Sequence, residues 1–532
     1  MMFNSKTLFK RKANKNSGHT STDELYSSDN SQSDFSRIEE TKKNIQNQFG
    51  NSSDFTITPL LMGQSNGMVV YLNTMIDKNL LAEYVVTPLK KFNNQNGMIT
   101  TGDLESFRKD YLSGLISERI TNFHQLTWCI LSGYAVIIVD GICEAIGIEI
   151  GNAEKRPITE PSTQTIIRGP KDSFTESLQT NISLIRRRIK NPNVRFTSYV
   201  IGKDTRTSVS IGYIEGITNQ DILDEVTKRV EAIETSSILD SGNIEEYIAD
   251  KSFTPFPMSN NTERPDAISA GLIEGRIAIL VDGSPFVLQV PSVMTDFFKS
   301  SEDYYQPFFM ASFIRLIRYM SFMIALVLPS LYVAITTYHQ ELMPTQLLIS
   351  VQAQREGVPF PAVFEILMME LTFEVLREAG IRMPRAVGQT VSIVGALVIG
   401  QAAVEAGLVS NVLVIIVAFT AIASFVSPIY NFSISTRLLR FVLIIGASLL
   451  GLYGILIILI LMVVHLTSLR SFGVPYLTPV APLIIEDQKD LFVRFPIWNL
   501  HSRPAYLKSS SPKFSEETKT PAPPEGNNGG EV

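Results

Sequence analysis

Hydrophobic and polar residues are distributed very differently in the two halves of this chain. Up to about residue 307, apolar residues recur in short strand-like and helix-like patterns, as in an ordinary soluble protein. Beyond that point long apolar runs dominate, and between Ala386 and Val464 the only charged residues are Glu405, Arg437 and Arg440. The pattern predicts an α/β soluble N-terminal region followed by an α-helical multi-pass membrane domain.

Two hairpin patterns organise the soluble region. Tyr134 to Ile150 and Arg276 to Val290 each consist of two apolar runs joined by an Asp-Gly pair. Asp-Gly favours a hairpin turn because glycine supplies positive φ, so Asp140 and Asp282 need no catalytic role. Two hairpins of one design predict two α/β subdomains.

Helix and disorder signals divide the rest of the chain. Ser173 with Glu176 three residues later forms a capping box, which predicts a helix from Ser173 to Ile189. Both ends of the chain are too polar to bury a core, so they are predicted to be disordered. The predicted parts are a disordered tail (1–53), subdomain 1 (54–165), subdomain 2 (166–307), a helical membrane domain (308–470), a C-terminal cap segment (471–508) and a disordered tail (509–532).

Four apolar segments are long enough to cross a bilayer as helices. They lie near residues 319–338, 386–404, 412–430 and 441–464. The last is interrupted by glycines but is too short to cross twice. We therefore expect at least four spans.

A further helix over 361–379 is ambiguous because it carries Glu370, Glu374 and Glu378 on one face. It either lies at the membrane interface or on the soluble domain, or it crosses or re-enters the membrane with an acidic stripe facing water. The arginines fit both four and five spans, so the side of the C-terminal tail stays open.

The segment from Gly388 to Glu405 has two different faces when it is placed on a helix. One face, suited to close helix packing, consists of small residues every four positions: Gly388, Ser392, Ala396 and Gly400. The opposite face is polar at both ends and apolar in the middle: Thr390, Val394, Leu397, Gln401 and Glu405.

This second face suits the wall of a pore if copies of the chain form a ring. Glu405 would then place carboxylates at one mouth, which favours cations, and Val394 with Leu397 would form an apolar gate. The same pattern also suits a helix buried in a monomeric bundle, because small-residue stripes are common in membrane helices.

The sequence gives no indication of an enzyme, a cofactor or a metal site. The soluble region lacks a phosphate loop, zinc-ligand spacing, a nucleophile elbow and a Cys/His pair. Cys129 and Cys143 lie in apolar surroundings, so both are expected to be buried, reduced thiols. The net charge of −6 does not indicate a nucleic-acid partner.

Several long motifs resemble the A-subunit family of GerA-type spore germination receptors. They are RGPKDSFTESLQTNISLIRRRIKNP, RMPRAVGQTVSIVGALVIGQAAVEAGLVS, SPIYNFSISTRLLR, FGVPYLTPVAP and RFPIWNLHSRP. The resemblance runs from about Phe55 to Pro504 and leaves out the polar tails.

The resemblance implies a multi-pass protein of the inner spore membrane with a cytoplasmic N-terminal domain of two α/β subdomains. It implies two partners, a transporter-like B subunit that carries the nutrient site and a lipoprotein C subunit. It further implies that A subunits form homo-oligomers in the lipid and act as a ligand-gated channel for monovalent cations when a nutrient triggers the spore. The alternatives are a secondary transporter of the nutrient, or a signalling scaffold on a passive membrane anchor.

Overall fold

The computed structural model describes residues 35–89, 99–112, 115–151, 160–161, 163–383, 395 and 398–514. The chain divides into two compact units, Met1–Gln48 with Asp54–Ala153, and Phe49–Ser53 with Glu154–Val532. The first unit contains one α/β subdomain. The second contains another α/β subdomain, a helical region and the C-terminal segment.

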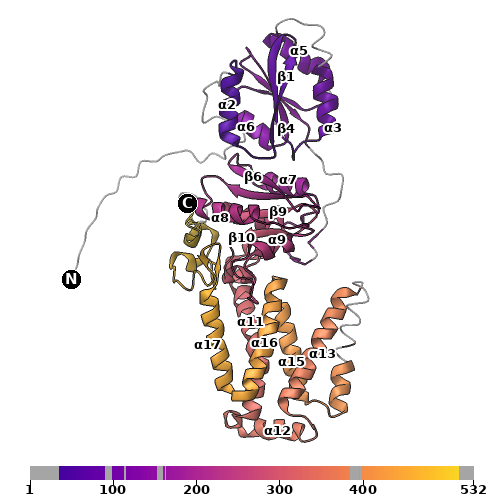
Figure 1. Ribbon diagram of the computed structural model, residues 1–532, viewed down its shortest axis with the longest axis vertical. Helices are drawn as coiled ribbons and strands as arrows, with labels where there is room; N and C mark the ends of the chain where they lie inside the picture. The colour runs from indigo at the N-terminus through magenta and orange to yellow at the C-terminus, as the bar shows by residue number, and fades with distance from the viewer. Residues whose placement is uncertain are drawn as a thin grey trace, which may run out of the picture. The chain divides into compact units, whose positions relative to one another are not determined.

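The first unit is built on a five-stranded antiparallel sheet with the strand order β1-β2-β4-β5-β3 (Figure 1). All six residues of β4 are buried, because helices cover both faces of this central strand. That is why β4 has the sequence of a continuous apolar run. The elements are α2 (Ile38–Phe49), β1 (Phe55–Met62), β2 (Ser65–Leu72), α3 (Lys78–Leu80), η1 (Leu81–Val86), α5 (Thr101–Tyr111), β3 (Ser117–Ile120), α6 (Phe123–Leu131), β4 (Tyr134–Val139) and β5 (Ala145–Glu149).

The α/β subdomain of the second unit repeats this design. Its sheet has the equivalent order β6-β7-β9-β10-β8, again with antiparallel neighbours. The prediction of two α/β subdomains therefore agrees with two sheets of one topology. The elements are α7 (Leu178–Arg188), β6 (Val194–Ile201), β7 (Thr207–Ile214), α8 (Gln220–Glu231), α9 (Ser241–Ile248), β8 (Asn260–Thr262), α10 (Pro265–Glu274), β9 (Ile277–Val281), β10 (Val287–Val290), η2 (Met294–Phe298) and η3 (Ser301–Tyr304).

Both predicted hairpins are confirmed as β4–β5 and β9–β10, although their connections are longer than two residues. The glycines after Asp140 and Asp282 have φ of +84° and +88°. Each aspartate has the same structural task. Asp140 Oδ1 accepts a hydrogen bond from the first amide of α2 (3.2 Å), and Asp282 Oδ1 accepts one from the first amide of α7 (3.0 Å). The carboxylates thus stabilise helix N-termini.

The prediction of disorder up to residue 53 is wrong at its C-terminal end, where Ile38–Phe49 forms α2. Thr41 and Ile45 are buried, and Gln48 accepts a hydrogen bond from Thr127 at 2.8 Å. These residues share one helix face, which gives a polar segment enough contacts to fold. Helix α7 also begins later than predicted, because Ser177 rather than Ser173 caps its N-terminus.

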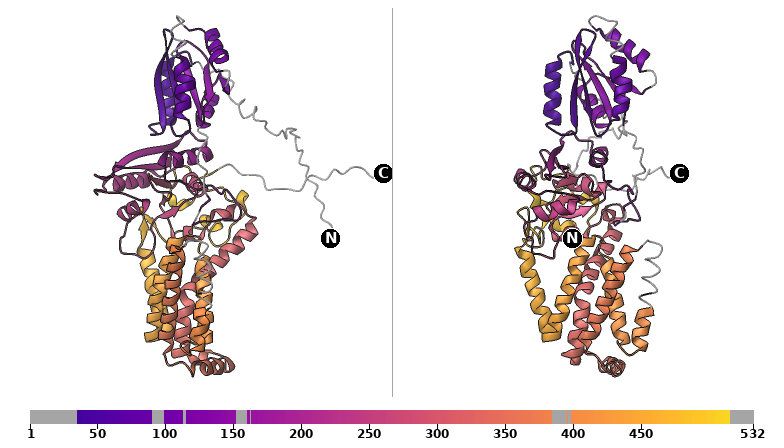
Figure 2. Two further views of the ribbon diagram at one scale, coloured as in Figure 1. Left: turned by 90° about the vertical axis from the view of Figure 1, so that its right-hand side faces the viewer. Right: turned by 45° about the vertical axis from the view of Figure 1, so that its right-hand side comes forward.

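The helical region of the second unit is a bundle in which α11 contacts α15, α16 and α17 (Figures 1 and 2). Helices α11 and α16 are long and apolar enough to cross a membrane, and α15 and α17 are shorter apolar helices. Predicted span 319–338 corresponds to the later part of α11, which ends one residue earlier, and α15 accounts for span 412–430 up to Phe425, whereas span 386–404 falls mostly outside the described residues. The helices are α11 (Phe308–Thr337), α12 (Thr345–Arg355), α13 (Ala362–Arg382), α15 (Asn411–Phe425), α16 (Tyr430–Leu450) and α17 (Leu452–Ser468), with residues 398–405 also helical.

The prediction of a single span over 441–464 is wrong, because the chain reverses at Gly451 and forms the helix pair α16–α17. Gly451 has φ of +62°, which ends α16. The two helices touch closely, since a Cβ on Gly454 would lie 2.0 Å from the carbonyl oxygen of Gly446. Three glycines therefore make a tight helical hairpin where one helix was expected.

The C-terminal segment returns to the second α/β subdomain after α17. Tyr476 donates a hydrogen bond to the carbonyl of Pro257 (2.9 Å), and the amide of Ser510 donates to the carbonyl of Ile217 (3.1 Å). Residues 509–514, predicted to be disordered, are thus in part ordered by contacts with the subdomain. The short elements are β11 (Arg470–Ser471), β12 (Val474–Pro475), η5 (Glu486–Lys489), η6 (Ile497–Asn499) and η7 (Ala505–Leu507).

Candidate functional site

A buried pair of opposite charges joins three helices of the bundle. Glu370 on α13 and Arg440 on α16 lie 2.6 Å apart, and their side chains are only 3% and 2% exposed. Arg440 Nε also donates to the carbonyl of Ala325 on α11 at 2.7 Å. Charge-assisted hydrogen bonds therefore tie α11, α13 and α16 together.

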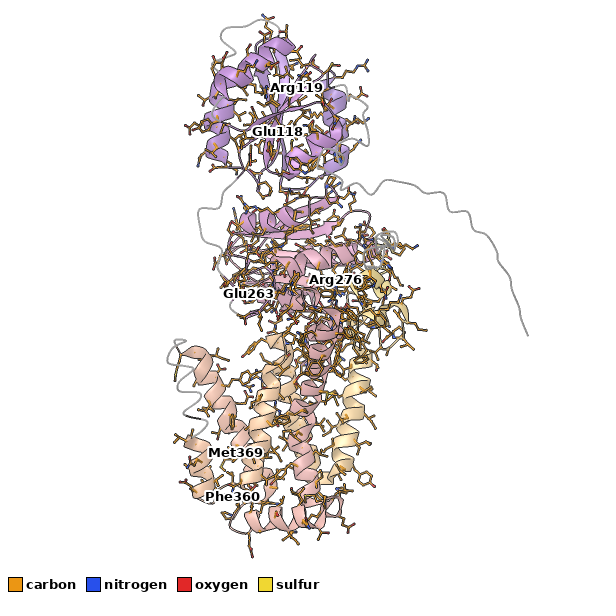
Figure 3. The ribbon with its side chains drawn as sticks, turned by 180° about the vertical axis from the view of Figure 1, so that it is seen from behind. Glu118, Arg119, Glu263, Arg276, Phe360 and Met369 are labelled. Atoms are coloured by element: carbon orange, nitrogen blue, oxygen red, sulfur yellow. The ribbon has the colours of Figure 1, made fainter. Side chains whose placement is uncertain are left out.

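This pair lies in apolar surroundings. Buried side chains around it include Ile366 and Met369 of α13 (Figure 3) and Leu443 of α16. Among the described residues, neither Glu370 Oε1 nor Arg440 Nη2 has a hydrogen-bond partner. Taking both charges out of water is costly, and such groups in an apolar helix bundle typically serve function.

A second charged cluster lies one helical turn along α13. Glu374 accepts from Arg437 of α16 at 2.7 Å and pairs with Arg377 at 3.3 Å. Arg377 also donates to Ser424 Oγ at 2.9 Å and stacks over the ring of Phe425, both on α15. The two clusters make a continuous ladder of charges between α13 and its neighbours.

A third carboxylate on α13 binds the N-terminus of α15. Glu365 is fully buried and accepts from the amide of Ser410, the N-cap of α15, at 3.2 Å. Arg355 lies 3.4 Å away on the other side. The carboxylate therefore stabilises both a helix dipole and a cation.

The predicted acidic stripe of α13 does not face water as a unit. Glu370 faces the bundle interior and Glu374 lies between two arginines, while Glu378 is exposed and pairs with Arg382 at 2.6 Å. Of the two alternatives for this helix, a position at the membrane interface or on the soluble domain does not account for its packing against α11, α15 and α16. Glu374 and Glu370 instead bind Arg437 and Arg440 of α16, which follow them by 63 and 70 residues in the chain.

The structure describes only part of the two stripes predicted on 388–405. Gly388, Thr390, Ser392, Val394, Ala396 and Leu397 lie outside the described residues. Gly400 is buried against α15 of the same chain, where a Cβ would lie at an ordinary contact distance of 3.6 Å from Val414. Gln401 and Glu405 are both exposed, and Gln401 Nε2 donates to Glu405 Oε1 at 2.9 Å. The polar end of the predicted pore face therefore points away from the rest of its own chain.

A second charged network joins the start of α11 to the C-terminal segment. Asp490 binds Lys299 at 3.0 Å, Arg315 at 2.8 Å and the hydroxyl of Tyr304 at 2.6 Å. Burial alone would raise the pKa of Asp490, but the charges of Lys299 and Arg315 outweigh it and lower that pKa to about 2. Asp303 in turn binds Arg315.

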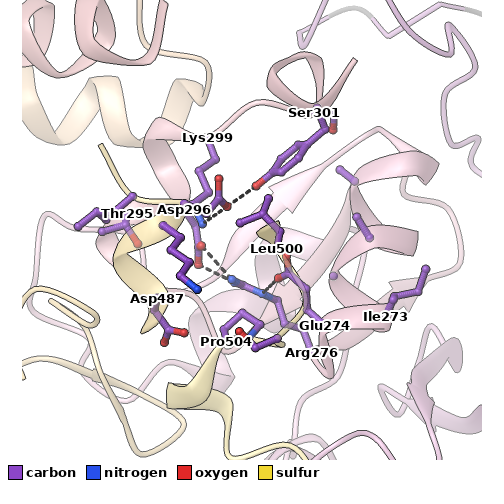
Figure 4. A pocket seen from close by; sticks show the side chains of 18 of the residues that line it. Ile273, Glu274, Arg276, Thr295, Asp296, Lys299, Ser301, Asp487, Leu500 and Pro504 are labelled. Atoms are coloured by element: carbon purple, nitrogen blue, oxygen red, sulfur yellow. Dashed lines mark hydrogen bonds and ion pairs between the residues drawn. The ribbon is translucent and has the colours of Figure 1, made fainter. Parts of the chain in front are cut away.

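A cavity of about 460 Å³ adjoins this network, between the second α/β subdomain and the C-terminal segment. Figure 4 shows Arg276 inside it, between Asp296 and Glu274; its Nη2 is 2.9 Å from Asp296 and its Nε is 3.1 Å from Glu274. Burial raises the pKa of Glu274. These charged side chains of the cavity wall are therefore already paired with one another, and Asp490, which also lines the cavity, binds Arg315 of α11.

Sequence reasoning missed the partners in both networks. Arg437 and Arg440 directly precede the predicted span 441–464. Their spacing of three residues inside an apolar helix indicates that they share one buried helix face. Asp303 lies in the short helix η3 and Asp490 directly follows η5, and both elements are too short to give a periodic pattern that indicates these residues. Cys143, expected to be buried, is exposed.

Comparison with known proteins gives consistent matches. A family model described as Bacillus/Clostridium GerA spore germination protein matches residues 43–506. Spore germination protein KA of Bacillus subtilis (strain 168) is 47% identical over 490 residues, which cover 91% of this chain and 89% of that protein. The protein of the same organism named as uncharacterized membrane protein YfkQ is 41% identical over 464 residues, covering 87% of this chain and 89% of its own length.

The chain is also similar to a solved structure. It is the crystal structure of the N-terminal domain of the A subunit of the Bacillus megaterium spore germinant receptor GerK3, 34% identical, covering 49% of this chain and 96% of that chain with a TM-score of 0.40. The family model extends over most of the chain, and the sequence relatives share more than 40% of their residues with it over most of both lengths. The resemblance carried by the motifs is thereby confirmed, and the chain belongs to the GerA family of Bacillus/Clostridium spore germination proteins.

Proposed function

We propose that this chain is the A subunit of a nutrient-responsive germination receptor, and that copies of it form a ligand-gated cation channel in the inner spore membrane. Family membership supports the receptor role. In this proposal a transporter-like B subunit and a lipoprotein C subunit complete the receptor, and the A subunit itself catalyses no reaction.

The helical region crosses the membrane an even number of times in this proposal. Both the entry to α11 and the segment after α17 contact the second α/β subdomain, through Arg315 with Asp303 and through Tyr476 with Pro257. Two segments bound to one soluble subdomain lie on the same side of a bilayer. We place that side in the cytoplasm, where the tendency for arginines to face inward also puts Arg470.

The observation that carries the channel proposal is the exposed edge at Gln401 and Glu405. Residues 398–405 are otherwise mostly apolar, and the hydrogen bond that the described residues give Glu405 comes from Gln401 of the same helix. A carboxylate turned outward from a membrane bundle needs water or a polar partner. A ring of copies around an aqueous pore supplies both, and it concentrates negative charge where cations pass.

Gating follows from two arrangements of the bundle that bind a nutrient-loaded partner with different affinities. In this proposal the carboxylates of the charge ladder between α13 and α16 exchange one arginine for another between the two arrangements, so that no buried charge is left unpaired in either. Val394 and Leu397 close the pore in the resting arrangement by excluding water.

The test measures potassium release from spores whose receptor carries Glu405→Gln or Leu397→Ala. Glu405→Gln is expected to slow nutrient-triggered release, because it removes the negative ring, and Leu397→Ala to release ions without nutrient. The matched control is Glu378→Gln, an exposed carboxylate on α13 paired with Arg382. Release like that of the unmodified receptor in both variants, at equal receptor levels, would refute the pore assignment.

A further inference from the structure

One apolar side chain of the second unit stands out by its exposure. Phe253 is 94% exposed, the highest value among the large apolar side chains that the structure describes. It belongs to residues 249–256, here called the rim loop, which follow α9. A single exposed apolar side chain is common on protein surfaces, so the surroundings of Phe253 decide whether it faces an apolar environment.

The rim loop is held at one end of the helix bundle. Thr254 Oγ1 lies 3.0 Å from His465 Nε2 in the last turns of α17, and the carbonyl of Pro255 accepts a hydrogen bond from Ser435 of α16. The ring of Phe256 packs against those of Phe432 and His465, at centroid distances of 6.4 and 6.2 Å. These contacts fix Phe253 at the level where α16 begins and α17 ends.

The outer surface of α17 is apolar up to this level. Its exposed residues include Ile457, Ile460, Leu461 and Val464, and the helix becomes polar at His465 and the two residues Thr467 and Ser468. In a membrane-spanning bundle this change marks the boundary between acyl chains and headgroups. Phe253 lies beside that boundary.

Basic residues at the same end complement an anionic headgroup layer. Lys251 in the rim loop and Arg470, two residues after the end of α17, are both exposed. One aromatic side chain flanked by cations is the composition by which peripheral loops bind anionic membranes. The two cations lie on separate chain segments, which meet where Thr254 contacts His465 of α17 and where Asp250 accepts a hydrogen bond from the amide of Phe472.

We propose that the rim loop is an interfacial membrane anchor, in which Phe253 inserts between the headgroups and acyl chains of an anionic bilayer while Lys251 and Arg470 bind lipid phosphates. This inference rests on the proposed crossing of the membrane by the bundle. Its consequence is that the second α/β subdomain is held to the lipid surface directly, in addition to its connection through α11.

The test places a nitroxide spin label at single cysteines in the full chain, reconstituted into vesicles of phosphatidylglycerol and phosphatidylcholine. The background carries Cys143→Ser, since Cys143 is exposed and Cys129 is buried. Labels are compared at Phe253→Cys, at Leu461→Cys on the apolar face of α17, and at Val200→Cys on strand β6, which is 68% exposed at the opposite edge of the subdomain's sheet. Collision with oxygen, which dissolves in lipid, is compared with collision with a water-soluble nickel chelate.

The label at residue 253 is expected to collide with oxygen in preference to nickel, as at residue 461, whereas the label at residue 200 shows the reverse. A second variant carrying Lys251→Gln and Arg470→Gln should reduce the oxygen preference at 253 and leave that at 461 unchanged. Nickel preference at 253 with oxygen preference at 461 would overturn the anchor and leave the membrane bundle intact. Low collision with both reagents at 253 would mean a protein partner and would also overturn it. Nickel preference at 461 would instead refute the proposed membrane crossing.

Discussion

The buried pair between Glu370 and Arg440 offers a direct test of how the helical region is held together. Glu370→Ala removes one charge and leaves Arg440 with the carbonyl of Ala325 as its remaining hydrogen-bond partner among the described residues. An arginine stranded in this way keeps the cost of desolvation without the attraction that offsets it. We expect the variant to be strongly destabilised.

The magnitude follows from burial. Breaking a buried ion pair by removing one partner costs about 3–5 kcal/mol, whereas exposed pairs contribute about 0–1 kcal/mol. The chain supplies a matched control on the same helix, because Glu378 and Arg382 lie at the same 2.6 Å separation but are 58% and 77% exposed. Glu378→Ala should therefore cost less than about 1 kcal/mol. Replacing both buried partners by methionine should cost less than Glu370→Ala alone, because no unpaired charge remains.

The free energy of unfolding can be measured in mixed micelles by raising the fraction of dodecyl sulfate. The chain has two tryptophans, and Trp128→Phe leaves Trp498 as the sole reporter. Trp498 contacts Phe308 at the start of α11 with ring centroids 6.4 Å apart, so its fluorescence follows the second unit.

Equal losses for Glu370→Ala and Glu378→Ala would refute the reasoning, because they would show that burial does not set the strength of the pair. The reasoning would also be refuted if replacing both Glu370 and Arg440 lowered the free energy of unfolding by the sum of the two single replacements, because additive losses mean that the two charges do not interact.

Three further outcomes are expected. The pKa of Asp490 is about 2 in the folded chain, so its stabilisation should be full above about pH 4 and be lost as the pH falls towards 2. The difference in unfolding free energy between the unmodified chain and Asp490→Asn should therefore be smaller at pH 3 than at pH 6. Gly451→Ala should destabilise the second unit by about 1–2 kcal/mol, because alanine is strained at φ +62°, and an equally stable variant would show that the helix reversal tolerates a side chain. A maleimide reagent should modify exposed Cys143 within minutes and leave Cys129 unmodified in the folded chain, since burial raises the pKa of Cys129 to about 12; equal labelling of both would contradict the packing around α6.

The sequence predicted those parts of the fold that depend on local patterns. The apolar runs around Asp140 and Asp282 predicted both hairpins, since a turn between two strands is specified by neighbours in the chain. The order of the five strands was beyond sequence reasoning, because β3 and β8 pair with strands that follow them at the far edge of each sheet. That pairing depends on contacts between distant segments.

The candidate site was predicted less well for a related reason. The sequence places the boundary of a predicted span at Arg440, because charges usually mark the ends of membrane spans. In the structure Arg440 lies in the middle of one helix, Tyr430–Leu450. Its partner is 70 residues away on α13, and only the folded bundle brings the two together. The small-residue stripe stays a prediction, because Gly400 is its one member among the described residues, and there it contacts α15 of the same chain.

The network around Asp490 has a mechanical consequence. Its carboxylate holds Arg315, in the third turn of the first helix, and Lys299, which precedes that helix, while Asp490 itself follows the last helix by 22 residues of chain. Asp490 therefore joins the start of α11 to the segment that follows α17, and Ser312 of α11 adds a second link through hydrogen bonds with the backbone of Arg494. A displacement of the α/β subdomain consequently acts on the chain before the first helix and after the last helix together.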